Sequence, residues 1–293
     1  DVVWTINSGI KPNENYYYIN YGFGYAKYKN TNNDLIQEIE VFVPENEAVK
    51  ISNVKLKNTS NKNRNLKLLV YIKPVLGEDE IFTNGNIEVT KEENIIYAKN
   101  ILPEEQFDRP MFLSSSIPIS SFTGNKDIFL GSKSLEAPRA LYEKLDQKNG
   151  LGKNSCVAIE IEIELNAYEN KEFAIMLGQE EKEKIKEIVD NFKDNLNREN
   201  ALLKVKQNWN NITQKLSVKT PSESINLLIN GWLIYQTLSS RLYGRTGFYQ
   251  SGGAYGFRDQ LQDSLGMKFV DSKLLEEQII NCASHQFIEG DVL

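Results

Sequence analysis

Apolar and polar residues alternate along much of the first 178 residues, a pattern that is typical of β-strands with one buried face. Within 157–165 the large apolar side chains fall on one face and the glutamates on the other. Ser121–Asn125, in contrast, has the composition of a turn. Many short strands in a row predict an antiparallel β-sandwich, with strands at 39–43, 49–57, 66–72, 87–89, 94–98 and 157–165.

The spacing of the apolar residues changes after Gly178. Between 180 and 208 the apolar residues recur mostly at spacings of three, four or seven, which predicts one stripe on a solvated helix formed by Ile185, Ile188, Val189, Phe192, Leu196 and Leu203. Thr220–Ser224 predicts a helix start, and the many apolar residues of 225–242 predict a mostly buried helix. Further helices are expected from about 258 to 267 and from about 272 to 289.

The sequence therefore predicts a mainly β region followed by an α-helical region. We expect a sandwich domain at 1–178, a helical linker at 179–219, and a helical domain at 220–293. A length of 293 residues is consistent with about two domains.

The composition argues against several functional classes. Thirty-four Lys and Arg against 40 Asp and Glu give a net charge of −6, which disfavours binding to nucleic acid or to an anionic membrane. No apolar run approaches the ~18 residues of a membrane span, and no signal peptide is visible, so we expect a cytoplasmic location. The two cysteines, Cys156 and Cys282, and the single histidine, His285, predict neither a disulfide framework nor a metal site.

The candidate binding residues are concentrated between residues 245 and 263, where a glycine-rich, aromatic loop leads into Arg258, Asp259 and Asp263. The two aspartates are one helical turn apart, so their carboxylates would share a face. Carboxylates accept hydrogen bonds from sugar hydroxyls, arginine donates to sugar oxygens, and aromatic rings cover C–H faces. The alternative is a plain loop between helices, with Arg258 paired internally to Asp259 or Asp263. A phosphate-cradling loop is disfavoured because no Gly-Lys-Ser/Thr ending is present.

The run FYQSGGAYGFRDQLQD at 248–263 resembles the signature loop of glycoside hydrolase family 94. This family contains inverting phosphorylases of β-glucosides and the phosphorylase-like domain of cyclic β-1,2-glucan synthase. The resemblance continues at 277–280 and 285–292, and upstream at 22–25, 41–44, 71–77, 121–124 and 129–131. Those upstream blocks look most similar to the β-1,2-glucan branch.

This resemblance implies an N-terminal β-sandwich, a helical linker and the first helices of an (α/α)6 barrel. It implies that Arg258 and Asp263 hydrogen-bond a glucosyl unit in the −1 subsite, that Asp259 and Gln262 are adjacent binding residues, and that Gln250 and Tyr255 line the mouth. Inorganic phosphate would be the co-substrate, a β-glucan oligosaccharide the carbohydrate substrate, and no metal or organic cofactor would be needed. Relatives of this kind usually form homodimers.

The sequence also departs from the family pattern. No position matches the family's general acid, an aspartate in an Asp-Gly-Asp-Trp type of segment, so no catalytic residue is assigned and the acid is expected beyond residue 293. The family's first strands should also precede residue 3, so the resemblance implies a sandwich at 1–178 that lacks its first strands. We therefore expect a chain that is truncated at both ends. Three hypotheses remain: part of a glycoside phosphorylase, a domain of a membrane-bound cyclic β-1,2-glucan synthase, or a catalytically inactive carbohydrate-binding fragment.

Overall fold

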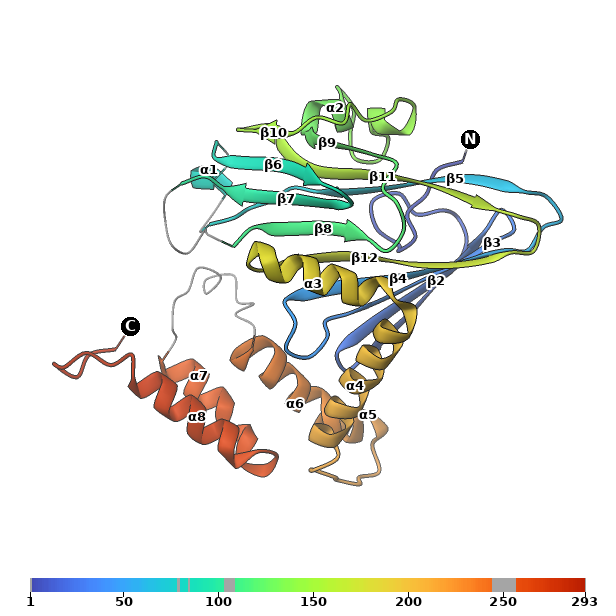
Figure 1. Cartoon of the computed structure of the whole chain (residues 1–293). Helices are drawn as coiled ribbons and strands as arrows, with labels where there is room; N and C mark the ends of the chain where they lie inside the picture. Colours follow the sequence, from blue (N-terminus) through green and yellow to red (C-terminus); the bar gives the residue numbers. More distant parts are fainter. Residues whose placement is uncertain (1, 78–79, 84, 103–108, 244–256, 293) are drawn as a thin grey trace. The chain divides into compact units, whose positions relative to one another are not determined.

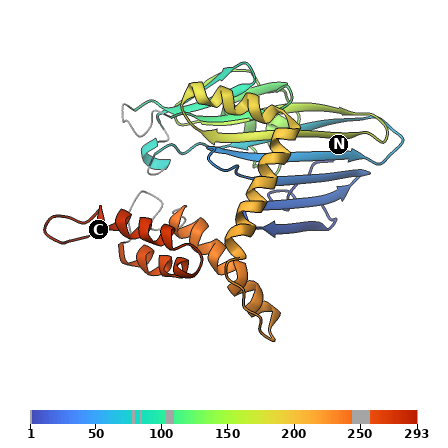
Figure 2. The same ribbon diagram turned by 60° about the horizontal axis from the view of Figure 1, so that its bottom comes forward.

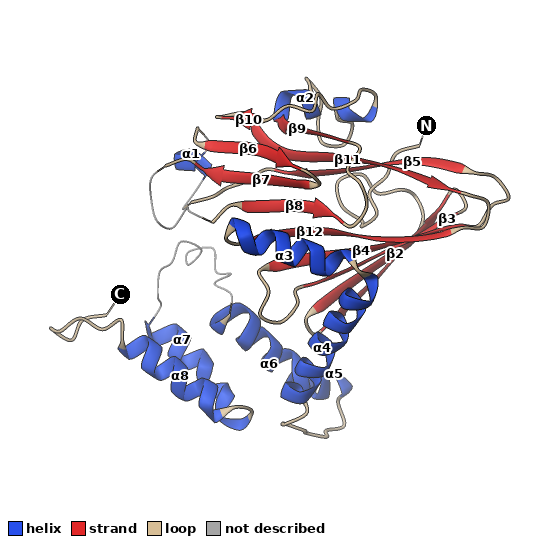
Figure 3. Cartoon of the chain, viewed as in Figure 1, coloured by secondary structure: helices blue, strands red, loops and turns tan. Residues whose placement is uncertain are grey.

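The computed structural model describes residues 2–77, 80–83, 85–102, 109–243 and 257–292. Contacts divide the chain into two compact units, Asp1–Val205 and Lys206–Leu293. Strands fill most of the first unit, and the described part of the second is helical (Figures 1 and 3). This order confirms the prediction of a β-sandwich followed by helices.

In the described residues, twelve strands form two antiparallel sheets. One sheet has nine strands in the order β1-β2-β3-β4-β12-β8-β7-β6-β10, and the other has three in the order β5-β11-β9. Figure 2 shows β1 to β4 lying side by side. The strands are β1 (Tyr17–Gly22), β2 (Tyr25–Asn32), β3 (Leu35–Phe42), β4 (Val49–Asn58), β5 (Arg64–Ile72), β6 (Ile87–Glu92), β7 (Ile95–Asn100), β8 (Met111–Ser115), β9 (Ser121–Asn125), β10 (Gly150–Leu151), β11 (Ser155–Leu165) and β12 (Asn170–Gln179).

The main core lies between the two sheets, and β11 supplies its central row. Val157, Ile159 and Ile161 are fully buried there, against residues such as Val54 and Phe173 of the larger sheet. Each such side chain contributes roughly 1.5–3 kcal/mol through removal from water. The predicted division of β11 into an apolar and a glutamate face is therefore confirmed.

The outer face of β11 is covered as well, by the segment that holds α2 (Lys126–Leu130) and η2 (Arg139–Leu141). Glu160 lies on this face, yet it is fully buried. Its carboxylate is 3.0 Å from Nζ of Lys67, a contact that balances the charge without hydrogen-bond geometry. In the same outer cluster, the rings of Tyr71 and Phe129 stack with their centroids 4.7 Å apart.

The expected turn at Ser121–Asn125 is wrong, because these residues form strand β9. β9 pairs with β11, with Ser121 opposite Glu160, and most of its residues are buried. Cross-strand hydrogen bonds and burial outweigh the weak local preference of Ser, Gly and Asn for turns. Gly124 and Gly150 meet here so closely that a Cβ on Gly150 would lie 1.9 Å from the carbonyl oxygen of Gly124.

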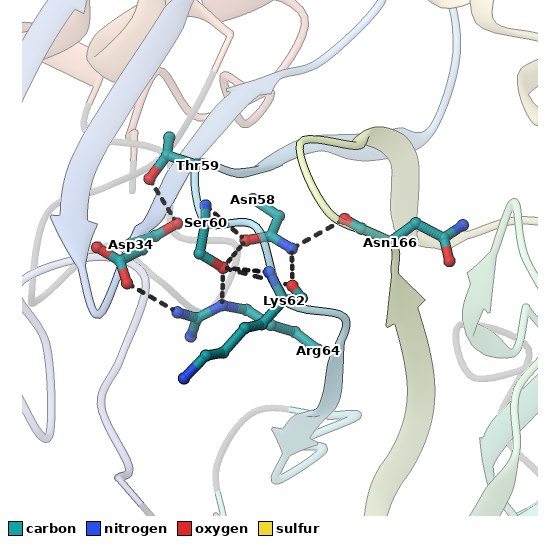
Figure 4. Close-up of polar contacts among 7 residues, drawn as sticks. All are labelled: Asp34, Asn58, Thr59, Ser60, Lys62, Arg64 and Asn166. Carbon is teal, nitrogen blue, oxygen red and sulfur yellow. Dashed lines mark hydrogen bonds and ion pairs between the residues drawn. The ribbon is translucent and has the colours of Figure 1, made fainter.

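Polar side chains join three turns at one end of the sandwich (Figure 4). The β2–β3 turn has positive φ at both central residues, +48° at Asn33 and +56° at Asp34, as in a type I′ hairpin. The Asp34 carboxylate pairs with Nη2 of Arg64 at 3.2 Å. Nδ2 of Asn58 donates to the carbonyl oxygen of Asn166 at 2.8 Å, which ties the two sheets together.

Residues 180–208 form two helices, not the single predicted stripe. α3 (Lys182–Lys193) ends at Asp194, which has an extended backbone, and α4 (Asn195–Thr213) begins directly after it. The four predicted apolar residues of α3 are buried, as expected. Leu196 and Leu203, however, are 63% and 53% exposed, because the non-helical residue shifts the helical phase.

A buried arginine holds the corner between α3 and α4. Arg198 is only 2% exposed, and its Nε donates to Oδ1 of Asn53 on β4 at 2.9 Å. Its Nη1 donates to the carbonyl oxygens of Phe192 and Lys193 at 2.8 and 2.7 Å, while Nη2 reaches Oδ1 of Asn195 at 2.8 Å. Arg198 therefore caps the C-terminal carbonyls of α3 and fastens the corner to the sheet.

After the end of α4, the next helix of the second unit begins at the predicted place. Oγ of Ser222 accepts a hydrogen bond from the Ile225 amide and caps α5. The described elements are α5 (Glu223–Leu227), the π-helical η3 (Leu228–Trp232), α6 (Leu233–Gln236), the π-helical η4 (Thr237–Leu242), α7 (Phe257–Ser264), the 3-10 helix η5 (Leu265–Phe269) and α8 (Ser272–Ala283); the short α1 (Glu80–Thr83) belongs to the first unit.

Two expectations for this unit are wrong. The stretch 225–242 is not mostly buried: Ile234 and Leu238 pack in a core with Met267 and Val270, whereas Leu227 is 67% exposed. Apolar content alone does not reveal which side of a helix is covered. The last helix ends at Ala283 rather than near residue 289. In the described parts of the chain, no helix is long and apolar enough to span a bilayer.

Candidate functional site

Helix α7 carries four of the six residues predicted to bind substrate. Its helical geometry places Asp259 and Asp263 one turn apart on one face, as predicted, with Arg258 and Gln262 beside them. All four side chains are exposed. The other two predicted residues, Gln250 and Tyr255, lie outside the described residues.

The opposite face of α7 is anchored. Gln260 and Ser264 are buried, and Nε2 of Gln278 on α8 donates to Oε1 of Gln260 at 3.4 Å. Figures 1 and 2 show α7 and α8 side by side. Met267, just after α7, packs in the core of this unit. The polar face of α7 is therefore held in a defined direction by contacts on its other side.

Each aspartate of this face has its own arginine. Nη2 and Nε of Arg258 both lie 3.2 Å from Oδ1 of Asp259, and the Arg258 side chain is 87% exposed. Oδ2 of Asp263 pairs instead with Nε of Arg241, which comes from η4. The internal pairing considered as the alternative thus occurs with Asp259 and not with Asp263.

Arg241 is a residue that the sequence interpretation missed. It lies 22 positions before Asp263 on a segment expected to be mostly buried. A charged side chain in a buried segment requires a partner, so the arginine at this position was a signal that could have identified Arg241. The π-helical turn that carries Arg241 is a second signal, since π-bulges often occur at functional sites.

The arrangement suits recognition of hydroxyl groups. Each arginine neutralises one carboxylate, so the two acids tolerate each other at a spacing that otherwise costs a few tenths of a kcal/mol. A carboxylate has more lone-pair sites than one guanidinium contact uses, and an exposed ion pair is worth only ~0–1 kcal/mol. A sugar can therefore bind the remaining sites, or replace part of a pair, at little cost.

The residues that could support other chemistries are arranged differently. The His285 ring lies just beyond α8, with Nδ1 2.8 Å from the carbonyl oxygen of Asn281. Both cysteines are buried free thiols, and burial raises the pKa of each. Among the described residues, no group of three or more His, Cys, Asp or Glu side chains could hold a metal ion.

Comparison with known proteins assigns both units. Residues 2–195 match the supersandwich domain of glycosyl hydrolase family 94, and residues 208–293 match the catalytic domain of that superfamily. The chain belongs to glycosyl hydrolase family 94. This family membership confirms the resemblance that was drawn from the loop at 248–263.

Two curated relatives illustrate the range of similarity. The cyclic β-(1,2)-glucan synthase NdvB of Rhizobium meliloti (strain 1021) is 29% identical over 93% of this chain and 10% of its own length. The N,N'-diacetylchitobiose phosphorylase of Vibrio proteolyticus is 23% identical over 94% of this chain and 36% of its own length. The chain thus spans between a tenth and little more than a third of these relatives.

A solved structure shares the fold. It is that of a protein assigned as a kojibiose phosphorylase, from the human microbiome, and it superposes with a TM-score of 0.51 over 86% of this chain and 33% of its own. At 12% identity this likeness concerns the fold alone.

Proposed function

We propose that the chain is part of an inverting glycoside phosphorylase that acts on β-glucosides. The observation that supports this most is the consecutive match to the sandwich and catalytic domain models of family 94. Relatives named as phosphorylases align with nearly the whole chain, which adds support. Inorganic phosphate would be the co-substrate and a β-glucan oligosaccharide the sugar substrate.

In the proposed reaction, a phosphate oxygen attacks the anomeric carbon from the face opposite the leaving sugar. A carboxylic acid protonates the glycosidic oxygen as the bond breaks, which yields α-glucose 1-phosphate and a shortened glucan. Phosphate takes the place that base-activated water has in inverting glycosidases. The acid has no assigned counterpart among the residues of this chain.

The described residues would bind and orient the glucosyl unit. Arg258 and Asp263 would hydrogen-bond its hydroxyls, with Asp259 and Gln262 beside them. Positioning of this kind lowers the barrier because the reacting atoms are held in line before the chemical step. A site built to pair hydroxyls also discriminates strongly, since a missing hydroxyl leaves a polar group unpaired.

The test uses the protein that contains this chain, incubated with cellobiose or β-1,2-oligoglucans and inorganic phosphate. Release of α-glucose 1-phosphate is followed with phosphoglucomutase and a dehydrogenase. We expect phosphate-dependent product, and a strong loss of turnover in Asp263→Asn. Glu276→Gln is the matched control, because Glu276 is an exposed acid on α8 outside the proposed site. Near-normal kinetics for Asp263→Asn would remove Asp263 from the site.

A second candidate function is a phosphorylase-like domain of a cyclic β-1,2-glucan synthase that trims or sizes glucan chains. The higher identity to NdvB, 29% against 23% for the chitobiose phosphorylase, favours it. A coding sequence that continues into membrane-spanning helices and a glycosyltransferase would support this candidate.

The homodimer and the cytoplasmic location stay predictions. Light scattering on the purified protein checks whether it forms a homodimer.

The third hypothesis, an inactive carbohydrate-binding protein, makes a different forecast for the same assay. The protein that contains this chain should then bind β-glucosides yet release no α-glucose 1-phosphate. Phosphate-dependent product would contradict this hypothesis.

A further inference from the structure

A pocket of about 280 Å³ lies in the first unit, at the corner between α3 and α4. Its third wall is the loop that joins β3 to β4. None of the residues predicted to bind substrate lines it. The volume is just below the ~300–1,000 Å³ range of ligand pockets, so it suits a small ligand of one or two rings.

Part of the pocket lining is apolar, and we call this part its floor. Phe192, from the last turn of α3, and Pro44, from the β3–β4 loop, are both buried and line it. Ala201 of α4 lines it too, and its small side chain leaves space at the centre of the helix face. Such a floor matches the C–H face of a sugar ring, which packs against apolar and aromatic groups.

The walls supply hydrogen-bonding groups of both kinds. Asn197, Asn200 and Lys204 occupy one face of α4 at spacings of three and four around Ala201. Nδ2 of Asn197 donates to the carbonyl oxygen and to Oδ1 of Asn191, at 3.0 Å each. The pair therefore retains the Asn197 oxygen as an acceptor and the Asn191 NH2 group as a donor.

The pocket is also held in place before any ligand arrives. Arg198, which points from the same turn of α4 into the protein, bonds the backbone carbonyls of Phe192 and Lys193 and the side chain of Asn53. The floor and the amide wall are thus fastened to the sheet. A preorganised site loses less entropy on binding.

The charges select among ligand classes. Two carboxylates, Glu45 and Glu47, line the pocket together with one cation, Lys204. Two carboxylates disfavour phosphate and other anions, whereas the ammonium group disfavours a metal cation. A neutral ligand rich in hydroxyls fits both the mixed charges and the amide groups.

We propose that this pocket binds one neutral sugar residue, a glucosyl unit of a β-glucan, as a second carbohydrate site in the sandwich unit. The sugar class follows from the pocket itself, while the choice of glucose rests on the proposed function. Such a site would retain a glucan chain on the protein between catalytic events.

The test is a titration of the ¹⁵N-labelled chain with glucose, sophorose and cellobiose, without phosphate. We expect saturable shifts of the side-chain amide signals of Asn191, Asn197 and Asn200. Ala201→Trp fills the pocket and should abolish these shifts. Asn200→Ala should weaken binding by about fivefold or more, through loss of one polar partner. Asn208→Ala, an exposed asparagine later on α4, is the matched control and should bind normally.

Several outcomes would overturn the proposal. They are the absence of shifts with all three sugars, unchanged sugar binding in a folded Ala201→Trp variant, and equal shifts with inorganic phosphate. Thermal unfolding checks that the variants fold. If Ala201→Trp does not fold, the sugar affinity of Asn200→Ala tests the proposal instead. Because Asp263→Asn should leave these shifts unchanged, failure here is distinguishable from failure of the proposed phosphorolysis.

Discussion

Replacement of Arg198 by methionine tests the buried fastener between the sheet and the α3–α4 corner. Methionine keeps much of the aliphatic packing but supplies no donor, so acceptors on Asn53, Phe192, Lys193 and Asn195 lose their partner. A buried acceptor without a donor costs ~1–3 kcal/mol. Asn53 and Phe192 are buried residues, whereas Lys193 and Asn195 are more exposed, so water replaces part of the loss there. We therefore expect the free energy of unfolding of this unit to fall by about 3–5 kcal/mol.

For a unit of this size that loss lowers the melting temperature by about 10 °C. The assay is urea unfolding in a Trp209→Phe, Trp232→Phe background, where Trp4 remains as the reporter beside the sandwich core. Lys204→Met, which removes an exposed cation from the same helix, is the control and should change stability by no more than ~0.5 kcal/mol. A loss below ~1 kcal/mol for Arg198→Met would show that these acceptors find water and would refute the reasoning.

The other predictions concern a close contact, alkaline pH and the candidate site. Gly150→Ala brings a Cβ to 1.9 Å from the Gly124 carbonyl oxygen and should cost about 3 kcal/mol. Gly266→Ala, with open space around it, should be neutral or mildly stabilising on thermal unfolding. Burial raises the pKa of the Cys156 thiol from 9.0 to about 12, so only the unfolded chain releases this proton between those values. Stability should therefore fall as pH rises through that window, and Cys156→Ala should reduce the slope of the urea midpoint against pH. Arg241→Ala should lower kcat/KM for phosphorolysis by about tenfold or more, because Asp263 loses its charged partner, and Arg241→Lys should restore part of it.

Each of these has an outcome that would contradict it. Equal melting temperatures for the two glycine variants would mean that the β9–β10 approach relaxes freely. If the slope of the urea midpoint against pH is unchanged in Cys156→Ala, the loss of stability at alkaline pH belongs to other groups. Tyr71 is one such group, because burial raises its pKa to about 12. Wild-type kinetics in Arg241→Ala would show that the Arg241–Asp263 pair has no part in substrate binding.

The period of the apolar residues predicted the sandwich well where one face of a strand is buried. Strand β11 is the clearest case, because its alternation matches the core on one side and a covered face on the other. The pattern failed at β9, whose residues have the composition of a turn and are held as a strand by pairing with β11. Local composition carries no record of a partner strand more than 30 residues away.

The helical errors have a similar cause. One non-helical residue, Asp194, resets the phase of the stripe, so Leu196 and Leu203 turn to water while Arg198 turns inward. No spacing rule predicts a buried arginine, since its burial depends on four acceptors from α3, α4 and β4. In the candidate site the sequence predicted the shared face of Asp259 and Asp263, but not Arg241, whose contact with Asp263 arises from helix packing.

The most direct test of the central claim is the anomeric form of the product, followed by ¹H and ³¹P NMR while the protein that contains this chain acts on a β-glucoside in phosphate buffer. The account predicts α-glucose 1-phosphate as the first product, with none formed when phosphate is left out. First formation of the β-anomer, or of free glucose at the same rate with and without phosphate, would contradict it.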